Sequence, residues 1–290
     1  MKKMWKRLTA MMLALVLALV PVTVRADAKP YLSLGADLTP EQRATVLSLL
    51  EITEADVQNL DVAYVTNTEE HQYLDAYMGQ QQIGSKSLSS VVVYQTAPGT
   101  GLTITAKNIT YCTEGMYRNA CQTAGLKDAK IIVAGPSPIS GTAALVGIIK
   151  AYQNMTGAEI TEDVIDGALN ELIVTGDIEG ALENVDPDVV EGMISQLKQE
   201  MVERDLNDAE SIGEAVDEAC KEYNVTLSDS ERTQVINLVL KLSQLDLSAE
   251  QLTDLVQKAQ SGAKVVDGIQ NFFQKIGEAI TGFFSKLFGG

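Results

Sequence analysis

The residues best suited to bind a ligand lie between Gly135 and Thr142 (GPSPISGT). They join a predicted buried strand to a predicted helix, and the free N–H groups and dipole at a helix start attract anions. Ser137, Ser140 and Thr142 add hydroxyl groups beside Gly141, so a small phosphate or carboxylate is the ligand that this loop would suit. The loop lacks the lysine of a P-loop and the glycine spacing of a dinucleotide loop. The alternative interpretation is a tight turn in which Ser140 is only the N-cap of the helix.

Catalytic residues are not indicated. A serine nucleophile needs a base within hydrogen-bond reach, and the chain has a single histidine, His71, next to Glu69 and Glu70 on a predicted helix. We expect His71 to be solvated, and no spacing pairs it with Ser140. The sequence therefore favours a non-catalytic protein, and we expect no cofactor.

Acidic pairs are the remaining candidates for metal binding. Asp177 with Glu179, and Asp186 with Asp188, offer the oxygen ligands that calcium prefers. Neither pair has the spacing of an EF-hand loop, and capping of helix starts explains both. The sequence predicts no metal site.

Three cysteines leave at least one thiol unpaired. Cys112 and Cys121 are nine residues apart, and whether they pair cannot be read from spacing. Cys220 falls on the apolar side of a predicted helix, where it would act as a small hydrophobic residue. Disulfide bonds are not expected to be the basis of the fold.

The N-terminus has the pattern of a secretory signal peptide, residues 1–26. A positive segment ending at Arg7 precedes an apolar run from Leu8 to Val22, and small residues lie around Ala26. We expect cleavage before Asp27 and a secreted or cell-envelope protein. An uncleaved anchor helix is the alternative, but the run is short for a bilayer span, which needs about 20 residues.

The mature chain is strongly acidic. Removing residues 1–26 removes five positive charges and changes the net charge from -17 to about -22. Nucleic acid is excluded as a partner, because its phosphates require lysine and arginine. An acidic surface is compatible with solubility, with cation binding or with a cationic partner.

Residues 27–157 are expected to form one α/β domain with a four-stranded sheet. Alternating and valine-rich segments predict strands over 61–65, 88–94, 102–107 and 130–134. Capping residues predict helices that start near Thr39, Asn67, Thr113 and Gly141. The middle of this order reads β-α-β-β-α-β, so the sequence predicts an α+β fold with a ferredoxin-like sheet.

Residues 158–260 are predicted to be all-helical. Apolar residues recur at helical spacing after Thr161 and Pro187, and a capping box begins at Ser228.

The last segment, residues 261–290, is predicted to be an amphipathic helix. Its apolar face contains the residues Phe272, Phe273, Ile276, Phe283, Phe284 and Phe288. Through residues 263–288 this face would contact a membrane surface or a protein partner, or it would pack on the helices of its own chain. The segment is less basic than most membrane-surface helices, but five phenylalanines are many for a helix that only packs in a core. Both interpretations therefore remain open.

Five short motifs resemble a family of exported proteins of Gram-positive bacteria, catalogued as domain of unknown function 1002. They span 33–39, 65–70, 108–110, 123–129 and 140–145. The segment from Ala134 to Pro136 departs slightly from the family's Ala-Ala-Pro, and Cys121 replaces an apolar residue. The resemblance implies export and a shared fold, and it implies no activity and no catalytic residue.

Two functional hypotheses follow. The first is a non-catalytic exported protein that acts by surface contacts at or near the cell envelope, with residues 263–288 as the membrane or partner contact. The second is a protein that binds a small anionic ligand, or a hydrolase, using the Gly135–Thr142 loop. The sequence identifies neither the ligand, the partner nor the oligomeric state.

Overall fold

The computed structural model describes residues 29–182, 184–248 and 252. Its strands are β1 (Tyr31–Gly35), β2 (Asp61–Val65), β3 (Ser90–Gln95), β4 (Leu102–Ile109) and β5 (Ala129–Ile139). Its helices are α2 (Pro40–Leu49), α3 (Glu54–Val57), α4 (Asn67–Leu74), α5 (Gln80–Ile83), α6 (Glu114–Thr123), α7 (Thr142–Thr156), α8 (Glu162–Ala181), α9 (Pro187–Glu203), α10 (Ala209–Glu222) and α11 (Asp229–Leu242). The predicted signal peptide and the predicted C-terminal helix, with its phenylalanines and Ile276, lie outside the described residues.

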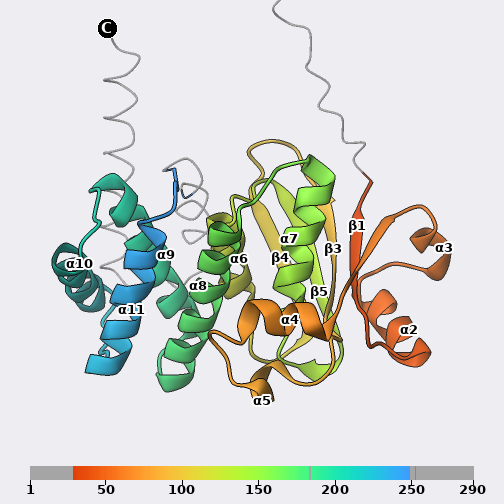
Figure 1. Ribbon diagram of the computed structural model, residues 1–290, viewed down its shortest axis with the longest axis horizontal. Helices are drawn as coiled ribbons and strands as arrows, with labels where there is room; N and C mark the ends of the chain where they lie inside the picture. The colour runs from red at the N-terminus through yellow and green to blue at the C-terminus, as the bar shows by residue number, and fades with distance from the viewer. Residues whose placement is uncertain (1–28, 183, 249–251, 253–290) are drawn as a thin grey trace, which may run out of the picture.

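The strands form one mixed sheet in the order β2-β1-β3-β5-β4 (Figure 1). The strands β2, β1, β5 and β4 all run in the same direction, since β1 pairs in parallel with β2 and β4 pairs in parallel with β5. Strand β3 lies between β1 and β5 and is antiparallel to both. The sheet therefore consists of two parallel pairs joined by one reversed central strand.

The α+β class is confirmed, but the expected four-stranded ferredoxin-like sheet differs from the structure. The sheet has five strands, because β1 was not predicted, and β5 separates β3 from β4 although a short turn connects those two. All five residues of β1 are buried. A strand covered on both faces has no alternation of polar and apolar residues to identify it, and strand order depends on distant pairing.

Helices cover both faces of the sheet. On one face, α2 packs Val46, Leu47 and Leu50 against Leu32 and Leu34 of β1. On the other face, α6 and α7 cover the strands and share a core that also takes in side chains of α8. This arrangement explains why β1, β3 and the first half of β5 are almost entirely apolar.

Local capping determines where the helices begin. The predicted caps are confirmed at Thr39, Thr113 and Ser228, each of which accepts a hydrogen bond from a backbone N–H three residues later. Helix α4 is capped by Thr66, which forms a reciprocal capping box with Glu69. These hydroxyl groups satisfy N–H groups that the helix itself leaves unpaired.

After Gly157 the elements of the described residues are the helices α8 to α11. Helix α8 belongs to two cores: Ala168, Leu169 and Leu172 pack with α6 and the sheet, whereas Ile178 packs with α9, α10 and α11. No helix in this described part of the chain is long and apolar enough to span a bilayer.

The cysteines are free thiols in the structure. Cys112 and Cys121 are both buried, and Cys220 is half-buried. Burial raises the pKa of Cys112 to about 12, and it raises the pKa of Cys121 as well. Both buried thiols are therefore protonated at neutral pH and unreactive.

Candidate functional site

The carboxyl ends of β1, β2, β4 and β5 meet at one edge of the sheet, the lower edge in Figure 1, where α4 and α5 also lie. Because β3 runs in the opposite direction, this edge also receives the start of β3 and the loop that leads into it. In open α/β sheets, ligands bind at the carboxyl ends of the strands. This edge is therefore the first place to search for a site.

A pocket of about 290 Å³ is present at this edge. We call it the carboxyl-edge pocket. It is lined by Glu70 of α4, by residues from Ile83 to Ser89 before β3, and by residues from Ile139 to Gly141 at the end of β5. Three segments that are far apart in the sequence thus enclose one space.

Helix α7 begins at the wall of this pocket. Its N-cap is Gly141 in a left-handed conformation (φ 94°), and no side chain caps the helix. The interpretation of Ser140 as the N-cap is therefore wrong: Ser140 Oγ lies 3.5 Å from the hydroxyl of Thr142 instead. Within the described residues, no hydrogen bond is found for the backbone N–H groups of Thr142 and Ala143, and both residues are buried.

Strand β5 extends further than the sequence predicts. Residues 135–139 continue the strand to Ile139, which pairs with Ile109 after a register shift in which residues 135–138 of β5 lie opposite Asn108 alone. The expected tight loop is therefore confined to Ser140 and Gly141. Ser137 is exposed and is not part of the pocket wall. Of the four predicted ligand-binding residues, the structure brings Ser140 and Gly141 to the pocket wall, buries Thr142 beside Glu70 of that wall, and leaves Ser137 outside.

A buried carboxyl group faces the start of α7. Glu70 is 2% exposed, and its Oε1 accepts a hydrogen bond of 3.3 Å from the hydroxyl of Thr142. Its Oε2 has no hydrogen-bond partner among the described residues. Burial raises the pKa of Glu70 to about 7, although nearby polar groups, including Ser87 and Asn67, oppose the rise. The group therefore changes its charge near neutral pH.

Two further polar side chains border the pocket. Ser89 is buried and its hydroxyl has no partner within the described residues, whereas Lys86 is exposed and lies on the pocket wall. A buried hydroxyl without a partner is costly, because it loses its hydrogen bonds to water. The pocket therefore holds several groups whose hydrogen bonds are incomplete.

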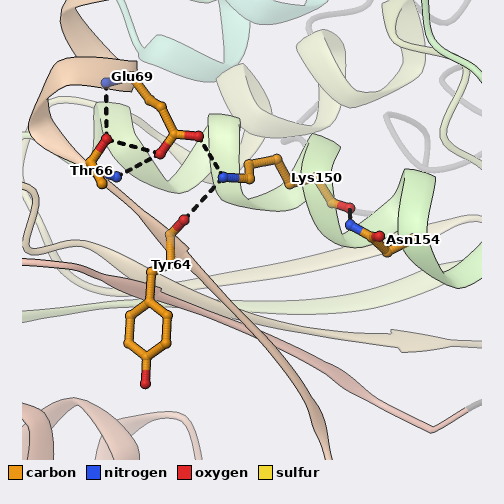
Figure 2. Close-up of polar contacts among 5 residues, drawn as sticks. All are labelled: Tyr64, Thr66, Glu69, Lys150 and Asn154. Carbon is orange, nitrogen blue, oxygen red and sulfur yellow. Dashed lines mark hydrogen bonds and ion pairs between the residues drawn. The ribbon is translucent and has the colours of Figure 1, made fainter.

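Figure 2 shows how α4 is fixed in front of α7. Lys150 of α7 donates to Glu69 Oε1 at 2.6 Å and to the carbonyl of Tyr64 at 3.0 Å, while Glu69 also accepts a hydrogen bond from the backbone N–H of Thr66. The same lysine's carbonyl accepts from Asn154 one turn later. One lysine thus ties together the end of β2, the start of α4 and the middle of α7, which holds Glu70 in position.

His71 supports the pocket wall and is not simply solvated, as the sequence suggested. Its Nδ1 lies 2.6 Å from a carboxylate oxygen of Asp75, and its Nε2 lies 3.1 Å from the carbonyl oxygen of Gly84, a wall residue. The side chain of Asn67 also donates to that carbonyl, at 3.2 Å. The hydrogen bond with Asp75 raises the pKa of His71. Because both ring nitrogens are engaged, His71 does not serve Ser140 as a base.

The opposite side of the wall is held by β1. Asp37 follows β1 and exchanges two hydrogen bonds with Ser87: Ser87 N donates to Asp37 Oδ2 at 2.8 Å, and Asp37 N donates to Ser87 O at 3.1 Å. The loop before β3 is therefore anchored at both ends of the pocket, by α4 and by β1.

The acidic pairs lie near the end of α8 and at the start of α9. Asp186 is the N-cap of α9 and accepts a hydrogen bond from the N–H of Asp188 at 3.1 Å. Burial and the charge of Glu191 raise the pKa of Glu179 to about 8. In the described ranges no three His, Cys, Asp or Glu side chains are grouped so that they could hold a metal ion.

A family model for a protein of unknown function, DUF1002, matches residues 34–259. The chain belongs to this family. The matched region contains the whole carboxyl-edge pocket, from Glu70 to Gly141.

A curated relative extends the match to nearly the full chain. The uncharacterized protein YpuA of Bacillus subtilis (strain 168) is 35% identical over 298 aligned positions, which cover 98% of this chain and 100% of the relative. No solved structure matches the chain.

Glu70 and Ser89 were missed from the sequence. A signal for Glu70 exists: it precedes the buried residues Leu74 and Met78 by four and eight positions, so it falls on the buried face of the segment. A glutamate at such a position indicates either a buried ion pair or a functional group. Ser89 carries no comparable signal, because serines are common before strands.

Proposed function

We propose that the protein binds a small molecule in the carboxyl-edge pocket and holds an acidic group of that molecule at the start of α7. The observation that supports this proposal most is the start of α7, which lies at the pocket wall and has no side-chain cap. The buried backbone N–H groups of Thr142 and Ala143 lack hydrogen-bond partners among the described residues. Such a helix start attracts a carboxylate or a phosphate. The hydroxyl groups of Ser140 and Ser89 provide further hydrogen bonds.

The surroundings of the pocket favour binding rather than catalysis. A nucleophile in this pocket would be Ser140, and its hydroxyl contacts Thr142 rather than a base. The adjacent histidine holds the wall through Gly84. What remains is a partly enclosed space of about 290 Å³ with both polar and apolar walls, which is a size suited to a small metabolite.

The surface-contact hypothesis concerns residues 263–288, which lie outside the described residues, so it stays a prediction, as does export. Binding in the pocket does not conflict with either. A flotation assay with vesicles of anionic lipid, using the mature chain with and without residues 263–290, tests the membrane contact. Equal flotation of the two forms would contradict it.

The proposed function is tested by calorimetric titration with inorganic phosphate and with small carboxylic acids, with and without an amino group. The double variant Ser140→Ala and Ser89→Ala should weaken binding of the tightest acid about tenfold, since each lost hydrogen bond contributes roughly 0.5 to 1.5 kcal/mol. Ser137→Ala is the matched control, because Ser137 is exposed on the same chain segment outside the pocket. Absence of binding by every acid, or an equal effect of the control, would overturn the proposal.

A further inference from the structure

The position of Glu70 determines which acids the pocket accepts. A pocket built only for anions would place cationic or neutral donors around the ligand, yet this one contains a buried carboxyl group whose Oε2 has no partner among the described residues. The other oxygen, Oε1, is within 3.3 Å of the Thr142 hydroxyl in the first turn of α7. A negative group and an anion-attracting helix start thus lie side by side.

We propose that the ligand is an α-amino acid, whose carboxylate binds the start of α7 and whose ammonium group binds Glu70. This inference rests on the proposed function. In an α-amino acid the two charged groups are attached to the same carbon, and this matches the short separation between Glu70 and Thr142. A ligand with a carboxylate alone would leave Glu70 unpaired, and an amine alone would leave the helix start unpaired.

The apolar part of the wall accommodates a side chain. Ile83, Leu88 and Ile139 line the same pocket, so an aliphatic side chain would be removed from water there. Lys86, which is exposed, also lines this pocket. The pocket therefore suits amino acids with aliphatic side chains.

The charged and titratable groups near Glu70 set the pH dependence. They are His71 on the same helix, Tyr117 beneath Gly141, and Lys86 on the wall. The ammonium group requires an ionised Glu70, and the pKa of Glu70 is about 7 in the free protein. Amino-acid affinity should therefore fall about tenfold per pH unit well below pH 7, whereas a plain carboxylate should bind better there.

The test compares matched ligands by calorimetric titration at pH 8: leucine against 4-methylpentanoate, alanine against propanoate, and 3-methylbutylamine as the amine alone. We expect the preferred amino acid to bind at least about tenfold more tightly than its deaminated partner, because hydrogen bonds to charged groups are the strong ones. Glu70→Gln should abolish this preference, and its fold is checked by circular dichroism and thermal unfolding. Glu162→Gln, an exposed glutamate of α8 outside the pocket, is the control that should retain it.

The outcomes separate the two proposals. If 4-methylpentanoate or propanoate binds as tightly as its amino acid, the amino-acid inference fails and the proposed function stands. If the amine binds and no acid does, inorganic phosphate included, or if neither these ligands nor inorganic phosphate binds, both fail. If Glu70→Gln folds and keeps the full preference, Glu70 is not the ammonium site and the inference fails.

Discussion

Two buried glutamates in this molecule have opposite surroundings. Glu171 of α8 is fully buried and lies 2.6 Å from the ammonium group of Lys198 in α9, and its second oxygen accepts from Thr123 at 2.5 Å. Glu70 is almost as deeply buried, but among the described residues it has no ion pair, and its one hydrogen bond of good geometry is the long one from Thr142. Ser87 and Asn67 lie near it without such geometry. The first carboxylate is compensated by its own chain, and the second is not.

The difference shows how burial alone can mislead. A buried carboxylate is tolerated when a cation and hydrogen bonds replace the water that it loses. In the first case Lys198 also donates to the carbonyl of Asn119 in α6, so the pair fastens three helices and has a structural role. In the second case the oxygen without a partner belongs to a side chain that lines the carboxyl-edge pocket. A buried charged group of this kind is typical of a functional site.

The largest expected effect is from removal of the lysine. Lys198→Met should lower the free energy of unfolding by about 3 to 5 kcal/mol, because it leaves a buried carboxylate without a cation. Urea unfolding at pH 7 measures the change. The double variant Glu171→Leu and Lys198→Met is the control and should recover most of the loss. A loss below about 1 kcal/mol in the single variant would show that the two glutamates are not so different.

The next effect has the opposite sign and depends on pH. Burial raises the pKa of Glu70 from 4.5 to about 7, so between these values the folded protein binds more protons than the unfolded chain, and the stability contributed by Glu70 falls as pH rises. Glu70→Gln should therefore stabilise the protein at pH 8 by up to about 3 kcal/mol and have little effect near pH 4. Denaturant unfolding across this range measures it.

Glu69→Gln provides the control for that pH series. Partial burial opposes ionisation of Glu69, but hydrogen bonds from Lys150 and Thr66 outweigh it and lower its pKa. The stability that Glu69 contributes is present at neutral pH and is lost as pH falls through its folded pKa, so this variant should be destabilised at pH 8. The same sign for both variants would contradict the contrast between neighbouring residues.

The smallest expected effects come from removing the threonine hydroxyl groups that bond to the two glutamates. Thr123→Val removes a short hydrogen bond to Glu171 and should cost about 2 kcal/mol, whereas Thr142→Val removes a long one to Glu70 and should cost about 0.5 to 1 kcal/mol. Both threonines are buried, so the change in packing is matched. Thermal unfolding at pH 7 gives the order, and an inverted order would contradict the assignment of Glu171 as the tightly bonded group.

Local features of the fold could be predicted from the sequence, and pairing could not. The caps at Thr39, Thr113 and Ser228 were readable because a hydroxyl and the N–H it accepts from are only three residues apart. The order of the strands depends on contacts between β3 and β5, whose residues are about 40 positions apart, such as Val91 with Val133. Nothing in either segment specifies that partner.

The candidate site was predicted in part for the same reason. The start of α7 was recognisable from Ser140, Gly141 and Thr142, because strand, turn and helix follow one another directly. Its partner Glu70 is 72 residues away from Thr142, and only the fold brings the two together. Ser137 was misplaced because a Pro-Ser-Pro run was read as a turn, although it lies within β5, in the register shift between the pairs Lys107–Ala134 and Ile109–Ile139.

The reversed direction of β3 has a consequence for how this architecture can vary. In an all-parallel sheet, the connection entering the middle strand would arrive at the amino side, away from the carboxyl-edge pocket. Here residues 83–89 arrive on the carboxyl side and form one wall of the carboxyl-edge pocket. The ladder of β3 with β5 starts only at Ser90, and its ladder with β1 starts at Val91. Insertions or deletions in that connection can reshape the pocket wall without shifting any hydrogen-bonded register of the sheet.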